Sequence, residues 1–377
     1  MRVTKLFKAF IKSEKSGGII LIVCTIFSLL ITNSNFGENY QAIWHTTLAG
    51  RSIEHWINDG LMTIFFLLIG LELEREIYHG ELSNIKEAIL PIFAAIGGMI
   101  VPAGLYLLFN FGSETKSGSG IPMATDIAFA LGILSLLGKR VPVALKIFLT
   151  ALAVIDDLGA ILIIAIFYTK TIVLSNLILA LSIFVLLLVC NRLKIKNLAI
   201  YIIGGIFMWY FMLNSGIHAT ITGILLAFTI PFGNGNPKTA SSILQHFLHN
   251  PVAYIVLPLF ALANTAIIIN SNILETLTQN YNLGIAFGLV IGKPLGIFFF
   301  SLLAIKLGFC ALPKHVNLKS ILGVGFLGGI GFTMSIFITL LAFEDQTTIN
   351  NAKFMILLSS LLAGMLGYII LKYVAKN

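Results

Sequence analysis

Four ionisable side chains stand in stretches of sequence that are otherwise almost entirely apolar. Asp156 and Asp157 are neighbours in a run that continues from Val141 to Tyr168, and Asp126 and Lys293 lie near the middle of two other runs. An ionised carboxylate at the centre of a bilayer is unfavourable by at least ~2.5 kcal/mol on insertion scales, and groups kept there usually handle ions or protons. We therefore expect these residues to form a membrane-embedded site for ions or protons.

The composition places the chain among polytopic membrane proteins. Hydrophobic residues make up 58% of the 377 residues and charged residues 11%, and the mean hydropathy is +0.97; soluble proteins of this length are far more polar. The two longest polar connections are too short to fold alone, so residues 1–377 are expected to form a single all-α transmembrane domain. Segments with the roughly twenty residues of a membrane span lie near 12–32, 57–78, 88–109, 115–137, 142–168, 173–190, 197–213, 216–230, 246–268, 282–305, 320–342 and 352–373.

The positive charges predict how these twelve spans are oriented. Lys and Arg favour cytoplasmic loops, and with both termini in the cytoplasm 19 of the 24 Lys and Arg residues fall on that side, while Lys293 lies inside the membrane. A basic face beside anionic lipid also accounts for the net charge of +8, so no nucleic acid partner is expected. Cys24, Cys190 and Cys310 are isolated, which indicates neither a disulfide framework nor a zinc cluster.

The two adjacent aspartates cannot face the same way, because neighbouring residues of a helix point about 100° apart. One of Asp156 and Asp157 can line a cavity while the other meets a neighbouring helix, and Lys293 is the only cation of the sequence at that depth. The alternative is a buried ion pair that merely holds helices together. Three acids against one base would leave charge that burial disfavours, so the sequence favours an ion-handling role.

Two spans carry signs of a broken helix. Glycines at 328, 329 and 331 occupy the centre of the eleventh span, and Thr125-Asp126 follows Pro122 in the fourth. Unwound backbone at this depth is tolerated where it is buried in protein or lines a cavity, and Asp126 could neutralise the positive N-terminal helix ends that a break creates. Glycines also serve as close-packing sites, so composition favours a break in the eleventh span and leaves the fourth open.

Long motifs around these residues resemble the NhaA family of bacterial sodium/proton antiporters. The resemblance begins at Ser16-Gly17-Gly18 and continues, in order and with few gaps, to the last span. It implies twelve helices with an inverted repeat, in which helices four and eleven are interrupted and cross. The five motifs that carry it are Ala124–Gly132, Leu145–Leu149, Ile155–Ala160, Ile291–Gly296 and Gly329–Ile338.

The resemblance also implies a role for each ionisable residue. Asp157 looks like the principal cation-binding carboxylate, and Asp156 like its partner in proton exchange, which can pair with Lys293. Thr125 resembles a residue that contributes an oxygen ligand, and Asp126 resembles the acid that balances the helix ends. Carboxylate, hydroxyl and carbonyl oxygens suit the hard cations Na⁺ and Li⁺.

The predicted activity is therefore secondary transport and not enzymatic catalysis. Na⁺ or Li⁺ and protons are expected to compete for one site, and the resemblance implies that two protons enter for each cation expelled. No cofactor is expected beyond the transported ions. The expected location is the inner membrane of a bacterial cell, where the exchange would serve sodium and pH homeostasis.

A second polar cluster lies at the inner end of the second span and contains Glu72, Arg75 and Glu76. The residues alone favour a solvated helix end. The resemblance implies pH sensing in this region, with His218 and His249 as further candidates. Position 74 is a glutamate where the family commonly has a lysine, so the activating pH cannot be transferred from relatives.

The outer loop 39–56 has the composition of a small hairpin around Gly50, with Ala42-Ile43-Trp44 on one side and Arg51–Glu54 on the other. A hairpin alone is marginally stable. We expect it to pack on the membrane surface or on a second subunit, and the family likeness favours a homodimer.

Three other functions can be compared with this one. An intramembrane aspartyl protease needs a Gly-x-Gly-Asp string, which the sequence lacks, and a retinal protein is disfavoured by twelve spans and by Pro294 directly after Lys293. The remaining alternative is an ion-coupled carrier of an organic anion on a related inverted-repeat fold. Such a substrate should need more polar or aromatic groups than the aliphatic, Gly and Thr neighbourhood of these acids offers.

Overall fold

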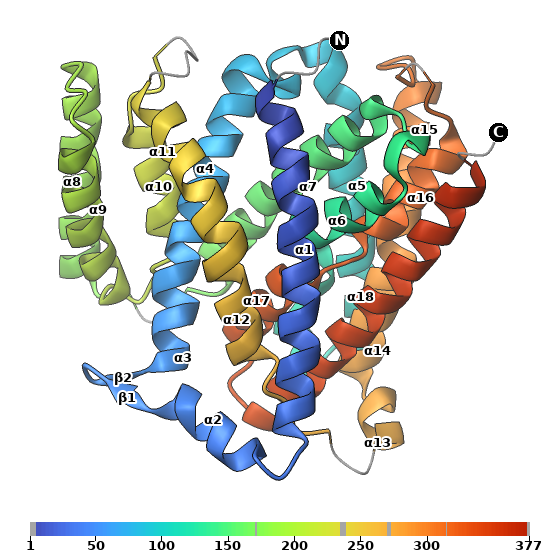
Figure 1. The fold of residues 1–377 in the computed structure, drawn as a ribbon, viewed down its shortest axis with the longest axis horizontal. Helices are drawn as coiled ribbons and strands as arrows, with labels where there is room; N and C mark the ends of the chain where they lie inside the picture. Colours follow the sequence, from blue (N-terminus) through green and yellow to red (C-terminus); the bar gives the residue numbers. More distant parts are fainter. Residues whose placement is uncertain (1–4, 170–171, 234–238, 270–272, 314, 375–377) are drawn as a thin grey trace. The chain divides into compact units, whose positions relative to one another are not determined.

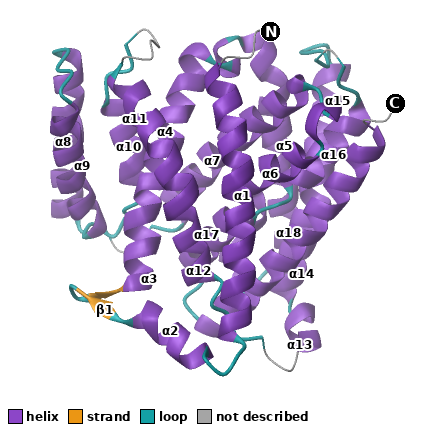
Figure 2. Cartoon of the chain, viewed as in Figure 1, coloured by secondary structure: helices purple, strands orange, loops and turns teal. Residues whose placement is uncertain are grey.

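The computed structural model describes residues 5–169, 172–233, 239–269, 273–313 and 315–374, which are helical apart from loops and one two-stranded hairpin (Figure 2). Five positive residues that the predicted orientation counts lie outside these ranges: Arg2, Lys238, Lys314 and Lys376 of the cytoplasmic side and Lys170 of the outer side.

The helices follow one another along the chain as Figure 1 labels them. They are α1 (Lys5–Thr32), α2 (Gly37–His45), α3 (Ile53–His55), α4 (Met62–His79), α5 (Ile85–Asn110), α6 (Ile127–Leu136), α7 (Val143–Phe167), α8 (Leu174–Arg192), α9 (Leu198–Leu213), α10 (Ile221–Thr229), α11 (Ala240–Pro251), α12 (Leu257–Asn264), α13 (Ile273–Thr278), α14 (Asn280–Phe287), α15 (Lys293–Lys306), α16 (Leu318–Gly328), α17 (Phe332–Ala342) and α18 (Gln346–Val374). Shorter 3-10 and π-helical segments join several of them, at Trp56–Leu61, Glu81–Ser83, Glu114–Met123, Gly138–Arg140, Val252–Val256 and Gly288–Gly292.

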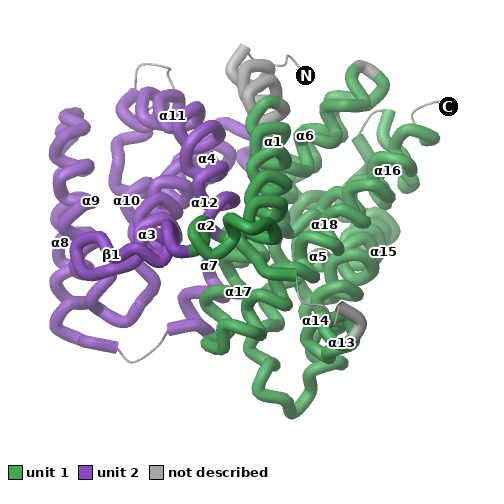
Figure 3. Tube along the Cα trace, turned by 60° about the horizontal axis from the view of Figure 1, so that its bottom comes forward, with its two compact units in different colours: residues 1–41, 84–160, 264–377 green, residues 42–83, 161–263 purple. Residues whose placement is uncertain are grey.

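The chain forms two compact units (Figure 3). Unit 1 comprises residues 1–41, 84–160 and 264–377, and unit 2 comprises 42–83 and 161–263. The predicted fourth and eleventh spans and all four ionisable residues of the predicted site belong to unit 1. The carboxylate cluster of α4 belongs to unit 2.

The predicted membrane architecture is confirmed. Among the described residues, seven helices are long and apolar enough to cross a membrane, and ten if each bent helix pair counts as one span. The shorter α9 and α10 supply helices for the remaining two predicted spans. For the eighth span the predicted start at 216 was too early, because Gly216 has a positive φ and the helix begins at Ile221.

Both predicted helix breaks are present. The segment Glu114–Met123 and α6 are bent by 41°, and α16 and α17 by 48°. Residues 124–126 run in extended conformation between the first pair, with Asp126 at φ −81° and ψ 100°. The fourth span, which composition left open, is therefore broken like the eleventh.

The predicted hairpin exists but is smaller than expected. Its strands are β1 (Thr47–Leu48) and β2 (Arg51–Ser52), paired antiparallel around Ala49 and Gly50, both of which have positive φ. The expected first strand at 42–44 was wrong, because those residues complete α2.

Close packing of α5 on α15 positions Lys293 inside unit 1. A Cβ on Gly97 would collide with the Gly296 carbonyl oxygen and with the Phe300 ring, so these helices meet backbone to backbone. On the next residue, a Cβ at Gly98 would come within 3.6 Å of Lys293 Cε. The glycines of α5 thus make room for α15 and for the lysine side chain.

Replacing Gly97 with valine should destabilise the protein, because overpacking a tight contact costs about 1–3 kcal/mol. We expect a clearly lower thermal midpoint for Gly97→Val in detergent, measured by the loss of the monodisperse peak in size-exclusion chromatography. Gly104→Val is the control on the same helix, since a Cβ at that position would meet no atom of another element within 4 Å. Equal midpoints for the two variants would contradict this account of the contact.

Candidate functional site

The two breaks of unit 1 touch through their backbones. The Asp126 amide donates to the Ile330 carbonyl oxygen at 2.7 Å. Close to this bond, the Thr125 hydroxyl lies 2.8 Å from the Gly328 carbonyl oxygen. Groups that a continuous helix would have satisfied internally are thus paired between the two broken spans, which is what buried backbone in a membrane requires. The predicted crossing of helices four and eleven is confirmed.

Asp126 lies at the N-termini of two helices at once. Its Oδ1 accepts from the Phe129 amide of α6 at 2.9 Å. Its Oδ2 accepts from the Thr333 amide of α17 at 3.1 Å and from the Thr333 hydroxyl at 2.5 Å. Helix N-termini carry partial positive charge and unsatisfied amides. One carboxylate therefore serves both half-helices, as its predicted role requires.

Lys293 is fully buried and bridges two elements of the site. Its ammonium donates to Asp156 Oδ2 at 2.7 Å and to the Met123 carbonyl oxygen, which ends the 3-10 segment before the break. Pro294 has no amide to donate to the carbonyl four residues earlier, and the helix forms a π-helical turn over Gly288–Gly292 just before the lysine. Lys293 thus neutralises both a carboxylate and a carbonyl end.

Asp156 Oδ2 is shared between the lysine and Thr125. The Thr125 hydroxyl lies 2.7 Å from this oxygen. Because the hydroxyl has one proton, it can donate to Asp156 or to Gly328 but not to both at full strength. Asp156 Oδ1 is buried without a hydrogen-bond partner among the described residues.

Asp157 is 1% exposed. It follows Asp156 on α7, so the two side chains point about 100° apart around the helix axis. It lies within electrostatic range of Lys293. The structure therefore brings together Thr125, Asp126, Asp156, Asp157 and Lys293 within unit 1. Carboxylate, hydroxyl and carbonyl oxygens gather there around a single ammonium group, a set of donors that suits a small hard cation.

The acidic cluster on α4 is not a solvated helix end, and that interpretation of the sequence was wrong. Glu72, Glu74 and Glu76 are 4%, 6% and 8% exposed. The reason is α11, which packs on this part of α4 within unit 2: Ser241 donates to Glu74 Oε2 at 3.4 Å, and His249 Nδ1 lies 4.0 Å from Glu72 Oε1.

Of the other pH-sensing candidates, Arg75 joins this cluster and His218 does not. Arg75 donates to Glu76 Oε1 at 2.8 Å. The His218 ring instead makes a 2.9 Å contact with the Tyr168 carbonyl oxygen. It is also close enough to Asp59 for an electrostatic interaction. The structure thus groups Glu72, Arg75, Glu76 and His249 but places His218 elsewhere in unit 2.

Among the buried polar residues that the sequence analysis did not identify, Ser360 and Lys353 make contacts between helices. Ser360 of α18 accepts a hydrogen bond from the Phe332 amide at the start of α17. Lys353, which the sequence places on the outer side, is 3% exposed and donates to Asn264 Oδ1 at 3.2 Å. A lone serine within an apolar helix gives no signal in a single sequence, and Lys353 lies where the predicted edge of the last span is uncertain.

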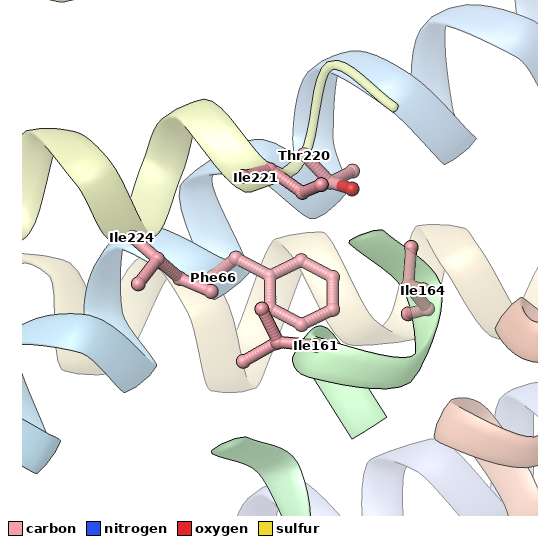
Figure 4. A pocket seen from close by; sticks show the side chains of 6 residues that line it. All are labelled: Phe66, Ile161, Ile164, Thr220, Ile221 and Ile224. Carbon is pink, nitrogen blue, oxygen red and sulfur yellow. The ribbon is translucent and has the colours of Figure 1, made fainter. Parts of the chain in front are cut away.

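Unit 2 also contains a small, partly open apolar pocket that has no room for a water molecule (Figure 4). Pockets that bind organic ligands are usually ~300–1,000 Å³ and present fixed polar groups. This one offers a single hydroxyl and no charge, so it suits neither a bare cation nor an organic anion. Its lining residues are Phe66, Ile161, Ile164, Thr220, Ile221 and Ile224.

Comparison with known proteins gives consistent matches over the whole chain. The Na+/H+ antiporter 1 family matches residues 8–371. A protein of Flavobacterium psychrophilum named Na(+)/H(+) antiporter NhaA is 72% identical over all of this chain and 98% of its own length. Proteins with the same name from Cytophaga hutchinsonii and Dechloromonas aromatica are 58% and 56% identical, again over all of this chain and over 97% and 98% of their own lengths.

These matches agree with the broken, crossing spans and with the buried carboxylates and lysine between them, and they do not favour the organic-anion carrier. The chain belongs to the Na+/H+ antiporter 1 family, the family of the NhaA antiporters.

Proposed function

We propose that the protein exchanges Na⁺ or Li⁺ for protons at the cluster formed by Thr125, Asp156 and Asp157. The observation that carries the proposal is the shared oxygen Asp156 Oδ2, which holds the Lys293 ammonium at 2.7 Å and the Thr125 hydroxyl at 2.7 Å. An incoming cation has to replace these two hydrogen-bond donors at Asp156 Oδ2. Binding of the cation and retention of the protons therefore exclude one another at this atom.

Charge balance supports such competition. With all three groups ionised, Asp156, Asp157 and Lys293 together carry one negative charge, which a single Na⁺ or Li⁺ would neutralise. Leaving the charge uncompensated in the membrane interior is costly, so either the cation or protons must occupy the site. When the site faces the cytoplasm the cation displaces protons, and when it faces outward protons displace the cation.

Lys293 contributes a second proton-carrying group in this scheme. If cation binding separates Lys293 from Asp156, the buried ammonium loses the partner that stabilises its charge and can release a proton. The cluster with the cation bound then carries one positive charge less than the proton-loaded cluster, in which Lys293 and one carboxylate are protonated. Two protons entering per cation expelled would move net positive charge inward, so the membrane potential could drive the exchange. The cation itself is cargo and not a resident cofactor.

We further propose that the protein lies in the inner membrane with both termini in the cytoplasm. The support is the distribution of Lys and Arg, 19 of 24 of which fall on that side for twelve spans. In this orientation the buried cluster of Glu72, Arg75, Glu76 and His249 lies at the cytoplasmic end of α4, the region in which the family likeness implies pH sensing.

Replacing Asp157 with asparagine should abolish exchange, because the variant cannot alternate between a charged ligand and a protonated group. The measurement is proton movement in inside-out membrane vesicles from cells that lack other antiporters, after addition of Na⁺, Li⁺ or K⁺ at several pH values. Na⁺ and Li⁺ should alkalinise the lumen for the wild type and not for Asp157→Asn. Asp345→Asn, at the exposed start of α18, should retain activity. Full exchange by Asp157→Asn would rule out the assigned site.

Asp126→Ala should destabilise the protein more than Asp126→Asn. Alanine leaves the Phe129 and Thr333 amides without their acceptor, and each lost cap costs about 1 kcal/mol, whereas asparagine keeps one side-chain oxygen. We expect the thermal midpoint in detergent to fall in the order wild type, Asn, Ala. A midpoint for Asp126→Ala equal to that of the wild type would show that the carboxylate does not hold the two helix ends.

The β1-β2 hairpin is proposed to join two copies of the chain, because an isolated two-stranded hairpin is marginal and its open edges can pair with another chain. Leu48 at its tip is 62% exposed. Leu48→Asp should shift cross-linked protein in membranes from dimer to monomer. Leu193→Asp, at an equally exposed turn after α8, should leave the dimer intact. An unchanged dimer in Leu48→Asp, or no dimer in the wild type, would count against this contact.

A further inference from the structure

The start of α17 in unit 1 depends on acceptors supplied by other elements. The first amides of a helix have no partner within it. At the start of α17, the Ser335 amide makes a bond of the helical type, because it donates to the Gly331 carbonyl four residues earlier at 2.9 Å. Of the earlier amides, Thr333 donates to Asp126. The amide of Phe332 donates to the Ser360 hydroxyl of α18 at 3.2 Å.

The α18 helix backs the whole break with small side chains. A Cβ on Gly329 would lie 3.3 Å from Ala363 Cβ, and one on Gly364 would lie 3.4 Å from Ile330 Cδ1. One turn further along, Gly367 faces Leu327 of α16 in the same way. Figure 1 shows α16 and α18 side by side. Ser360, Ala363, Gly364 and Gly367 thus lie on a face of α18 that contacts residues 327–332.

We propose that Ser360 is a positioning residue for cation exchange: its hydroxyl fixes the start of α17 and, through residues 328–331, the two carbonyls that face Thr125 and Asp126. This inference rests on the proposed exchange at the Asp156/Asp157 cluster. Ser360 itself touches neither carboxylate. It acts through the backbone between Phe332 and Gly328.

The connection to the cluster is short. Ile330, two residues before Phe332, accepts the Asp126 amide, and Gly328 competes with Asp156 for the proton of Thr125. If the start of α17 shifts, Gly328 moves with it and Thr125 donates more fully to Asp156 Oδ2. That oxygen is then less available to Na⁺.

A neutral hydroxyl is the suitable cap at this place. A carboxylate would add a negative charge beside Asp126 and bind cations itself, and an alkyl group would leave the Phe332 amide buried without an acceptor, which is unfavourable. Loss of the hydroxyl should therefore weaken cation binding more than it slows the exchange step.

The test compares Ser360→Ala, Ser360→Cys and Ser360→Thr with the wild type in inside-out vesicles. Proton movement is measured against Na⁺ and Li⁺ concentration at several pH values, and transporter amount is quantified in the same vesicles. We expect the half-saturating cation concentration to rise about 3- to 10-fold in Ser360→Ala, the effect of one lost hydrogen bond, with the maximal rate within about twofold. The rise should be smaller for Cys, a weak acceptor, and smallest for Thr.

The matched control is Ser359→Ala, which removes a buried hydroxyl from the neighbouring position of the same helix, about 100° away. It should keep the cation dependence of the wild type. Three results would overturn the proposal: unchanged half-saturation in Ser360→Ala, the same shift in Ser359→Ala, or shifts that follow side-chain volume so that Thr departs most. If Ser360→Ala does not insert, Ser360→Cys with wild-type half-saturation overturns it equally.

The failure of this proposal is distinguishable from failure of the exchange. A wild type that is inserted and moves no protons in response to Na⁺ or Li⁺ contradicts the proposed exchange. An active wild type with unaltered Ser360 variants contradicts only the positioning role.

Discussion

Backbone groups that two broken helices leave unsatisfied in the membrane interior are the constraint on which unit 1 depends. A helix break at this depth exposes amides and carbonyls that lipid cannot bind. The chain satisfies them in pairs: Asp126 accepts from both new N-termini, and Lys293 donates to the carbonyl of Met123 at a new C-terminal end. The Asp126 amide and the Ile330 carbonyl bind each other. Polar side chains at the crossing are therefore required by the fold before any ion arrives.

The same constraint explains why charged side chains gather at the crossing of the two broken spans. Lys293 is needed at the carbonyl end, and a buried ammonium in turn needs a carboxylate, which Asp156 supplies at 2.7 Å. Asp157 is the additional acid that leaves the cluster one negative charge in excess. A small cation or a proton is what can compensate that charge, because Gly98, Gly296 and Gly328 keep the surrounding helices close and leave little room for a larger substrate.

The sequence predicts the residues of the site better than the surfaces that support it. Asp126, Asp156, Asp157 and Lys293 are identifiable because charges in apolar runs are costly and therefore rare. The residues that support such groups from other helices cannot be identified in this way. Ser360 lies 28 residues along the chain from the Phe332 amide whose hydrogen bond it accepts, and Ser241 lies 167 residues from Glu74. A hydroxyl in a helix carries no cost that a single sequence reveals. The burial of the α4 carboxylates and the cap on α17 therefore emerge only when α11 and α18 are packed in place.

Lys293 links the Asp156 carboxylate to backbone geometry, because one ammonium serves both Asp156 and Met123. In the proposed exchange, a cation that takes Asp156 away from Lys293 changes the charge balance at the end of the 3-10 segment in the same event. That segment leads through Ala124 into Thr125 and Asp126, whose contacts hold the second broken span. In this scheme, a cation or proton that binds the carboxylates thus affects both broken spans through direct contacts. A site built on continuous helices, whose backbone groups are satisfied internally, would have no such connection between its ion and its main chain.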